Sequence, residues 1–200
     1  LESVRRIIEY CIKYNVKTLT LYAFSTENWK RPTKEVDGLL KLFSESISKE
    51  SKKIHSNKIK LNFIGDISTF TKALQLKIKE IEKVTFGNKK LVLNVALNYG
   101  GRLDIVNSVN AFYYNKKKIK KITEKNINSG LYTKGNSDVD LLIRTGGQQR
   151  MSNFLLWQSA YAELFFSKKL WPDFDEKIFV DALYFFQNTE RKFGSISKVT

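Results

Sequence analysis

The sequence predicts an α/β fold with a largely parallel central sheet flanked by helices. Two observations lead to this prediction. Short aliphatic or aromatic runs alternate along the 200 residues with longer runs whose apolar residues recur every three or four positions. Four of the strand-like runs also end in polar or glycine-rich turns. Because a chain of this length can bury a substantial core, we expect one domain over residues 1–200.

The first half of the chain begins with an amphipathic helix over residues 1–14, which Asn15 can terminate. A β-branched and aromatic strand over 18–24 leads into the polar residues 25–32, where Pro32 predicts a loop. A long helix and a short strand at 60–64 follow. The helix has apolar residues at Val36, Leu39, Leu40, Phe43 and Ile47.

Residues 71–84 fit a helix or an alternating strand, and their length and Glu, Lys and Gln content favour the helix. We expect a strand at 91–97, a surface excursion at 116–137, a short strand at 139–143 and a helix-like block at 154–157. Two more helices present an apolar face to the core. These faces are Ile105, Val106, Val109 and Phe112 in one helix, and Phe179, Ala182, Leu183 and Phe186 in the last, which follows Pro172.

Polar or glycine-rich turns follow the ends of four predicted strands. The turns in question are residues 25–31, 65–66, 98–101 and 144–147. Ligands of open parallel sheets bind beyond the carboxyl ends of the strands, so we expect these segments to line one cleft.

The stretch 138–166, DVDLLIRTGGQQRMSNFLLWQSAYAELFF, combines groups that suit a phosphate and its metal ion. The glycines of Thr145-Gly146-Gly147 let backbone N–H groups approach a ligand closely. Two cations, a hydroxyl and a carboxylate are close in sequence: Arg144, Arg150, Ser152 and Glu163. An ordinary strand–turn–helix with surface arginines explains the same pattern, and a structural ion pair explains Glu163 equally well.

The 25–31 loop is open to two interpretations as well. Ser25 and Asn28 commonly cap or turn the chain, but they can also hydrogen-bond a reacting substrate. Arg31 is either solvated beside Pro32 or a third phosphate ligand. The apolar residues of 40–43, 91–97 and 154–157 fit the core, or the wall of a channel for an apolar chain.

Composition excludes several classes of protein. Cys11 is the only cysteine and His55 the only histidine, so an internal disulfide is impossible, and a zinc site or a histidine-based triad is disfavoured. Cys11 lies on an apolar helical face and should pack in the core. No apolar run approaches the roughly 20 residues that span a bilayer, and no signal peptide is evident. Neither glycine pair matches a nucleotide-binding signature.

The net charge of +15 favours anionic partners such as diphosphates, nucleic acid or an anionic membrane surface. Much of the excess is lysine in solvated-looking runs such as 116–121. The net charge therefore does not indicate which of these anionic partners the protein binds.

Three long motifs resemble the cis-prenyltransferases, of the undecaprenyl diphosphate synthase type. They are YAFSTENWKRP at 22–32 with EVDGLL at 35–40, LNVALNYGGRLDIV at 93–106, and the stretch from 138 to 174 that contains RTGGQQRMS. The similarity runs from Leu1 to about Gly194 in the order of the family's motifs.

The resemblance implies a Mg²⁺-dependent transferase of isoprenoid biosynthesis. Such an enzyme condenses isopentenyl diphosphate repeatedly onto an allylic diphosphate, usually farnesyl diphosphate, and makes a long-chain cis-polyprenyl diphosphate. It also implies a hydrophobic tunnel, a homodimer, no nucleic acid partner, and a location in the cytoplasm or an organellar matrix. Peripheral contact with a membrane through the product is a further expectation.

The same resemblance assigns roles to residues. Arg144, Arg150, Met151 and Ser152 would hold the isopentenyl diphosphate, and Arg31 the allylic diphosphate. Ser25, Thr26, Glu27 and Trp29 would lie in the substrate loop, Asn28 at the position of proton removal, and Glu163 at the metal.

The chain departs from the family pattern in two places. The family's N-terminal Asp-Gly-Asn-Gly-Arg-Trp motif, with its metal-binding aspartate, does not occur in these residues. We therefore expect an N-terminal segment to be missing and residues 1–200 alone to be inactive. Gln149 stands where many bacterial members have histidine. A non-catalytic subunit that supports a partner, and a basic nucleic-acid-binding domain, are the alternative functions.

Overall fold

The computed structural model describes residues 1–114 and 121–191 and divides the chain into two compact units. The central unit is Cys11–Asn136, and the terminal unit joins Leu1–Tyr10 to the chain from Ser137 onward. Helix α1, Glu2–Lys13, begins in the terminal unit and ends in the central one. It matches the predicted helix, and Asn15 follows it with a positive φ of 58°. That residues 1–200 form one domain stays a prediction.

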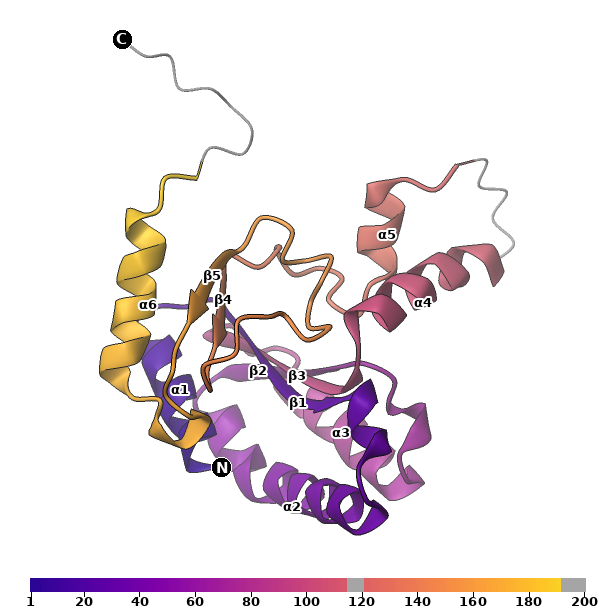
Figure 1. The fold of residues 1–200 in the computed structure, drawn as a ribbon. Coiled ribbons are helices and arrows are strands. Elements are labelled where there is room, and N and C mark those ends of the chain that lie inside the picture. The colour runs from indigo at the N-terminus through magenta and orange to yellow at the C-terminus, as the bar shows by residue number, and fades with distance from the viewer. Residues whose placement is uncertain (115–120, 192–200) are drawn as a thin grey trace. The chain divides into compact units, whose positions relative to one another are not determined.

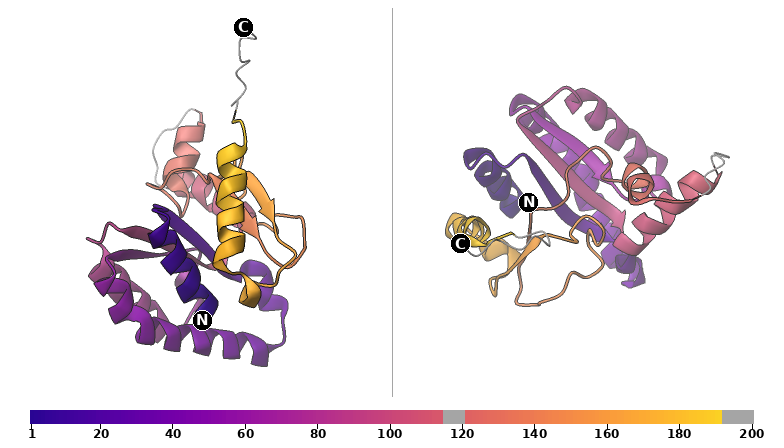
Figure 2. Two further views of the ribbon diagram at one scale, coloured as in Figure 1. Left: turned by 90° about the vertical axis from the view of Figure 1, so that its left-hand side faces the viewer. Right: turned by 90° about the horizontal axis from the view of Figure 1, so that it is seen from above.

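The central unit contains a three-stranded parallel sheet in the order β1-β3-β2 (Figures 1 and 2). The strands are β1 Thr18–Ser25, β2 Ile59–Ile64 and β3 Leu91–Tyr99. β3 lies in the middle, and its side chains from Leu91 to Tyr99 are largely buried. An aliphatic run covered on both faces is typical of parallel sheets, so the predicted strands and their parallel arrangement are confirmed.

Four helices accompany this sheet. They are α2 Thr33–Ser56, α3 Lys72–Thr85, α4 Gly101–Tyr114 and α5 Glu124–Gly130. Helices α2 and α3 pack on each other and on β2, and α4 packs on α5 (Figure 1). The ambiguous stretch 71–84 is helical, as its composition favoured, and Thr71 Oγ1 accepts a hydrogen bond from the Leu74 N–H at its start.

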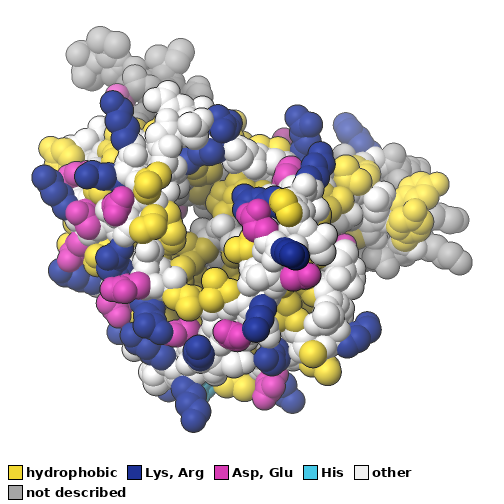
Figure 3. Space-filling view, turned by 60° about the horizontal axis from the view of Figure 1, so that its bottom comes forward, with side chains coloured by type: hydrophobic (Ala, Val, Ile, Leu, Met, Phe, Trp, Pro, Cys, Tyr) yellow, Lys and Arg dark blue, Asp and Glu magenta, His cyan; other side chains and the backbone are white. Residues whose placement is uncertain are grey.

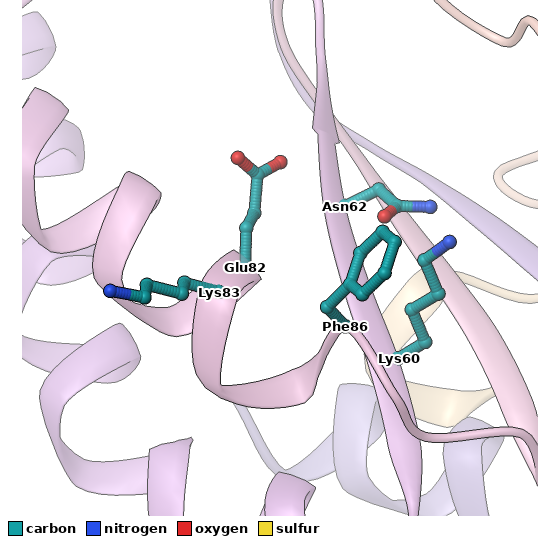
Figure 4. A pocket seen from close by; sticks show the side chains of 5 residues that line it. All are labelled: Lys60, Asn62, Glu82, Lys83 and Phe86. Atoms are coloured by element: carbon teal, nitrogen blue, oxygen red, sulfur yellow. The ribbon is translucent and has the colours of Figure 1, made fainter.

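Strand β2 is an edge of this sheet, and α3 protects it. The outward N–H of Phe63 donates to Glu82 Oε1 at 2.7 Å, and that of Leu61 donates to Thr85 Oγ1 at 3.1 Å. Exposed strand edges are sites of unwanted pairing, and these side chains occupy their donors. Figure 4 shows the shallow pocket beside this edge, where Glu82 and Phe86 come from the end of α3 and its following turn and Lys60 comes from β2.

Four sequence predictions fail in local structure. Thr26–Lys30 forms a 3-10 helix, η1, instead of an irregular loop. The expected excursion 116–137 contains α5, whose first turn Thr123 caps, while residues 115–120 lie outside the described part. The block 154–157 forms turns, and three residues with positive φ precede or interrupt it. Val106 is 53% exposed because Gly101, Asp104 and Ser108 form the buried face of α4.

The terminal unit contains the parallel pair β4 Leu141–Arg144 and β5 Glu163–Phe166, followed by η3 Trp171–Asp173 and α6 Glu176–Asn188. Helix α6 packs on β5, and its buried Phe179 lies 5.9 Å from the Tyr10 ring of α1. Asp175 caps α6 by accepting from the Ile178 N–H at 3.0 Å. Within the part of the chain that is described, no helix is both long and apolar enough to cross a membrane.

Candidate functional site

Three of the four predicted strand ends meet at one edge of the central sheet. Ser25 at the end of β1 pairs in register with Tyr99 at the end of β3. Gly65 follows β2 with a φ of +117°, and a Cβ there would lie 2.0 Å from the Leu97 carbonyl oxygen. Only glycine permits this close approach. The fourth segment, 144–147, follows β4 in the terminal unit, so its place in a common cleft stays a prediction.

The 25–31 loop is held at both ends of η1. At its start, the Asn28 Oδ1 accepts a hydrogen bond from the Ser25 N–H at 2.8 Å. Thr26 donates to the Glu27 carboxylate at 3.1 Å. Near the end of η1, Trp29 donates its indole N–H to Asn98 Oδ1 at 2.8 Å. These bonds bring the five predicted loop residues into one ordered turn.

Trp29 also packs into an aromatic cluster. Its ring centroid lies 5.2 Å from that of Phe24 on β1 and 6.0 Å from that of Phe70 after η2, Ile67–Thr69. The Phe24 and Phe70 rings lie 6.4 Å apart. Edge-to-face and tilted ring pairs at these distances are favourable, so the loop is anchored by packing as well as by hydrogen bonds.

Arg31 is half-exposed, and it donates to the Glu35 carboxylate one helical turn later at 2.7 Å. An exposed ion pair of this kind is worth about 0–1 kcal/mol. A phosphate with two or three charged oxygens can therefore compete for the guanidinium without a large loss.

Tyr22 lies near the same loop and was not predicted as a site residue. Its hydroxyl donates to the Tyr99 carbonyl oxygen at 3.2 Å. Burial, and after it the negative charge of Glu27, raise the pKa of Tyr22 to about 12, although a hydrogen bond with Ser25 opposes the shift. The tyrosine is therefore a neutral donor at physiological pH. Its only signal in the sequence is its position three residues before Ser25.

A second cluster follows β4 in the terminal unit. Arg144 donates from Nη1 to Ser152 Oγ at 2.6 Å and to the backbone oxygen of Arg150. Partial burial lowers the pKa of Arg144, and the positive charge of Arg150 lowers it further. Met151 lies between these residues, and its carbonyl accepts from the Phe154 N–H at 3.1 Å. Two guanidinium groups and a hydroxyl in one loop are a set of donors that suits an anion.

The glycine turn makes structural hydrogen bonds. Gly146 and Gly147 have φ values of 85° and 75°, which glycine adopts without strain. Their N–H groups donate to the carbonyl oxygens of Lys169 at 2.7 Å and Ser167 at 2.9 Å. These two N–H groups are therefore already bonded, and that other backbone N–H groups of the turn approach a ligand stays a prediction. The two bonds tie the loop of the arginines to the segment after β5.

Gln148 and Gln149 occupy the same loop. Gln148 accepts from Arg150 Nη1 at 2.5 Å, which orients that guanidinium. Gln149 is exposed.

Glu163 lies at the other end of the β4–β5 ladder from Arg144. It pairs with Leu141, whereas Arg144 pairs with Phe166, so three residue steps, roughly 10 Å, separate the two positions along the strands. The Glu163 carboxylate lies 3.9 Å from Arg191 Nε, and Arg191 Nη1 lies 3.0 Å from Asp140. The ion-pair alternative for Glu163 is therefore realised, and Arg191 is a partner that the sequence did not identify.

The described side chains do not by themselves fit a magnesium ion. Mg²⁺ takes about six oxygen ligands in near-octahedral geometry. Glu163 contributes one carboxylate, and a guanidinium already lies beside it. Across residues 1–114 and 121–191, no group of three histidine, cysteine, aspartate or glutamate side chains is arranged to hold a metal.

The comparisons with known proteins agree with the motifs. The family model described as "Putative undecaprenyl diphosphate synthase" matches residues 1–194. A ditrans,polycis-undecaprenyl-diphosphate synthase of Pasteurella multocida, specific for (2E,6E)-farnesyl diphosphate, is 49% identical over 96% of this chain and 82% of its own length. The synthase of the same name from Escherichia coli is 46% identical over 96% of this chain and 78% of its own.

Solved structures show the same fold. A probable undecaprenyl diphosphate synthase from Campylobacter jejuni matches with a TM-score of 0.89 and 35% identity, over 97% of this chain and 91% of its own. Lavandulyl diphosphate synthase from Lavandula x intermedia, solved with dimethylallyl diphosphate, matches with a TM-score of 0.91 and 32% identity, over 97% and 86%. The chain therefore belongs to the cis-prenyltransferase family, whose members include the undecaprenyl diphosphate synthases.

Proposed function

We propose that this protein elongates farnesyl diphosphate by repeated condensation with isopentenyl diphosphate and makes a long-chain cis-polyprenyl diphosphate. Relatives that are 46–49% identical carry the name of that activity and of that starter. In each cycle a carbon–carbon bond forms between the two substrates while the allylic carbon–oxygen bond breaks and diphosphate leaves. The isopentenyl unit then loses a proton, which places the new double bond.

The observation that carries the proposal is the cluster of Arg144, Arg150 and Ser152. Diphosphate binding requires several charge-assisted hydrogen bonds on one small surface. Partial burial lowers the pKa of Arg144, and the charge of Arg150 lowers it further; an anion bound between the two cations would relieve this second effect. We assign the isopentenyl diphosphate to this cluster, with Met151 contributing its backbone position.

The 25–31 loop is the proposed allylic side. Arg31 would exchange Glu35 for the allylic diphosphate, and neutralising that diphosphate makes it a better leaving group. Asn28 is the proposed residue of proton removal, while Ser25, Thr26, Glu27 and Trp29 shape the loop around the reacting carbons. Excluding water from this loop would protect the electron-poor allylic centre.

Mg²⁺ dependence is general for the family, and a bound ion would supply charge neutralisation at the leaving diphosphate. The described residues provide Glu163 as a single carboxylate, paired with Arg191. Its role as a metal ligand stays a proposal, and the steps above depend only on the protein side chains.

The growing chain also has a proposed place. Each isoprene unit buries about five carbons, an upper bound of roughly 4 kcal/mol at about 0.8 kcal/mol per carbon. A hydrophobic tunnel would hold the intermediate between additions and limit its length. A homodimer, and contact with a membrane through the product, are proposed with it.

Two other functions are less well supported. A non-catalytic subunit would not need the arginine cluster and the ordered substrate loop together. For a nucleic-acid-binding domain we would expect a continuous basic stripe. On the face shown in Figure 3, lysine and arginine side chains are instead scattered among acidic and hydrophobic ones.

The test is an elongation assay with farnesyl diphosphate, labelled isopentenyl diphosphate and Mg²⁺, using the full-length protein. We expect labelled long-chain product that grows with the supply of isopentenyl diphosphate. Arg144→Ala/Arg150→Ala is the matched inactive control. Absence of product from a folded, dimer-forming protein would favour the non-catalytic alternative.

A further inference from the structure

The side-chain amide of Asn98 connects three separate segments at the end of the central sheet. Its Oδ1 accepts the indole N–H of Trp29 at 2.8 Å. Its Nδ2 donates to the backbone oxygen of Asp66 at 2.9 Å and to Thr69 Oγ1 at 3.2 Å. The amide therefore joins the end of β3 to the turn after β2 and to the substrate loop.

Asparagine suits this position better than its alternatives. Asn98 is 5% exposed and has a φ of 47°, a left-handed conformation that asparagine tolerates. The three bonds use one acceptor and two donors of a single group, and only an amide offers that set. Aspartate would lack the donors, and glycine would allow the backbone conformation but make no bond.

Trp29, the loop residue that Asn98 bonds, lies close in sequence to two proposed substrate residues. Trp29 lies between Asn28 and Arg31 in sequence and is 40% exposed. Phe24 and Phe70 pack against the indole ring but make no hydrogen bond to its N–H. Without the bond to Asn98, what would be lost is the orientation of the indole, and with it the position of the two neighbouring substrate residues.

We propose that Asn98 is a positioning residue of the reaction, which acts through Trp29 to hold the 25–31 loop in its productive geometry. This inference rests on the proposed function, because it assumes that the loop carries the allylic substrate. A small misplacement of a reacting group can lower a rate by large factors, so one hydrogen bond outside the reacting groups can matter for turnover.

The first experiment measures the anchor directly. The chain has three tryptophans, so a ¹⁵N-tryptophan-labelled sample should give three indole N–H signals, and Trp29→Phe assigns one of them to Trp29. In Asn98→Gly, which retains the positive φ, we expect that N–H to exchange with water at least about tenfold faster. The other two signals should not change. An unchanged exchange rate at Trp29 would overturn the proposal.

The second experiment measures the consequence in the full-length protein. Asn98→Gly removes all three bonds of the amide, so we expect kcat/KM for farnesyl diphosphate to fall at least roughly tenfold, which is the upper range for one neutral hydrogen bond. The KM for isopentenyl diphosphate should stay within about twofold of the parent value. Asn88→Gly is the matched control, because Asn88 also makes a side-chain bond to backbone, to the Ile59 oxygen at 2.8 Å, but beside the start of β2.

A double-variant cycle separates positioning from general destabilisation. If Asn98 acts through Trp29, Asn98→Gly/Trp29→Phe should be no slower than the slower single variant, within about twofold. Multiplying effects would overturn the proposal, as would equal losses in Asn98→Gly and Asn88→Gly. If the parent protein makes no product, the proposed function and this role fall together; if the parent is active and Asn98→Gly matches it, only the positioning role is wrong.

Discussion

The proposed anion binding depends on arginine side chains, whose surroundings differ. Arg144 is oriented by Ser152 and by the backbone of its own loop, whereas the described partner of the Arg31 guanidinium is the exposed carboxylate of Glu35. A fixed donor loses less conformational entropy on binding than a mobile one. The Arg144 cluster should therefore contribute more to the affinity for its diphosphate than Arg31 does.

We expect Arg144→Ala to raise the KM for isopentenyl diphosphate roughly ten- to hundredfold, since a charge-assisted hydrogen bond is worth about 1.5–3 kcal/mol. Steady-state kinetics at saturating farnesyl diphosphate measure this. Arg144→Lys keeps the charge without the planar donor pair and should recover only part of the loss. Unchanged kinetics in Arg144→Ala would remove the residue from the site.

Asn28 has a structural contact besides its proposed part in proton removal, because its Oδ1 accepts a hydrogen bond from the Ser25 N–H. Asn28→Asp retains an acceptor for that N–H, whereas Asn28→Ala removes it. If Asn28 takes part in the chemical step, both variants should lower kcat more than they raise either KM. A loss confined to Asn28→Ala would instead show that the residue shapes the loop and takes no part in the chemistry.

At the scale of elements, two sets of hydrogen bonds hold the parallel strands in place. In the terminal unit, the glycine turn ties the segment after β4 to the one after β5. In the central unit, Glu82 and Thr85 of α3 bond the outward N–H groups of β2. The first set uses backbone groups only, so it does not occupy the arginine side chains. The second set places the partly buried carboxylate of Glu82 against an edge strand.

Glu82 should make stability depend on pH. Burial raises its pKa above the usual 4.5, and the hydrogen bond from the Phe63 N–H only partly opposes this. The folded state thus binds a proton more tightly than the unfolded state, and ionising Glu82 above pH 4.5 costs stability. In chemical denaturation, the unfolding free energy of the parent relative to Glu82→Gln should rise as the pH falls from 7 to about 4.

Glutamine is a suitable reference because it is similar in shape and retains an acceptor for the Phe63 N–H. The difference in unfolding free energy between the two proteins therefore reports on Glu82, because the titration of all other groups contributes equally to both. A difference between the two proteins that is constant with pH would contradict the raised pKa.

At the scale of the whole molecule, the net charge of +15 should place both proposed substrate-binding segments in a positive field. Such a field raises the local concentration of anions and speeds their association. On the face in Figure 3 the charge is dispersed, which suits small polyanions at defined arginines. Selectivity among anions then comes from the clusters and not from the total charge.

We expect the KM for both diphosphates to rise several-fold between about 0.05 and 0.5 M NaCl, because salt shortens the range of the field to a few ångströms. The assay should hold free Mg²⁺ constant, and the unfolding midpoint at each salt concentration controls for changes in the fold. A KM that does not depend on salt would show that only short-range contacts with the arginines matter.

The sequence alone was sufficient for most of the elements. Alternation and helical spacing are local properties, so they located most of the strands and helices, while length and Glu, Lys and Gln content decided for the helix at 71–84. The long motifs around Asn28 and Arg144 were sufficient for the family. Cys11 was correctly placed in the core: it is 1% exposed, and burial raises its pKa to about 12.

Only the tertiary structure decided which groups contact each other. The N–H groups of Gly146 and Gly147 bond the segment after β5. These bonds depend on where a strand some twenty residues away lies in the fold. The pairing of Glu163 with Arg191, and the three bonds of Asn98, likewise join residues that are distant in sequence. A residue's type states what it can donate or accept, but its partner depends on where the rest of the chain places the complementary group.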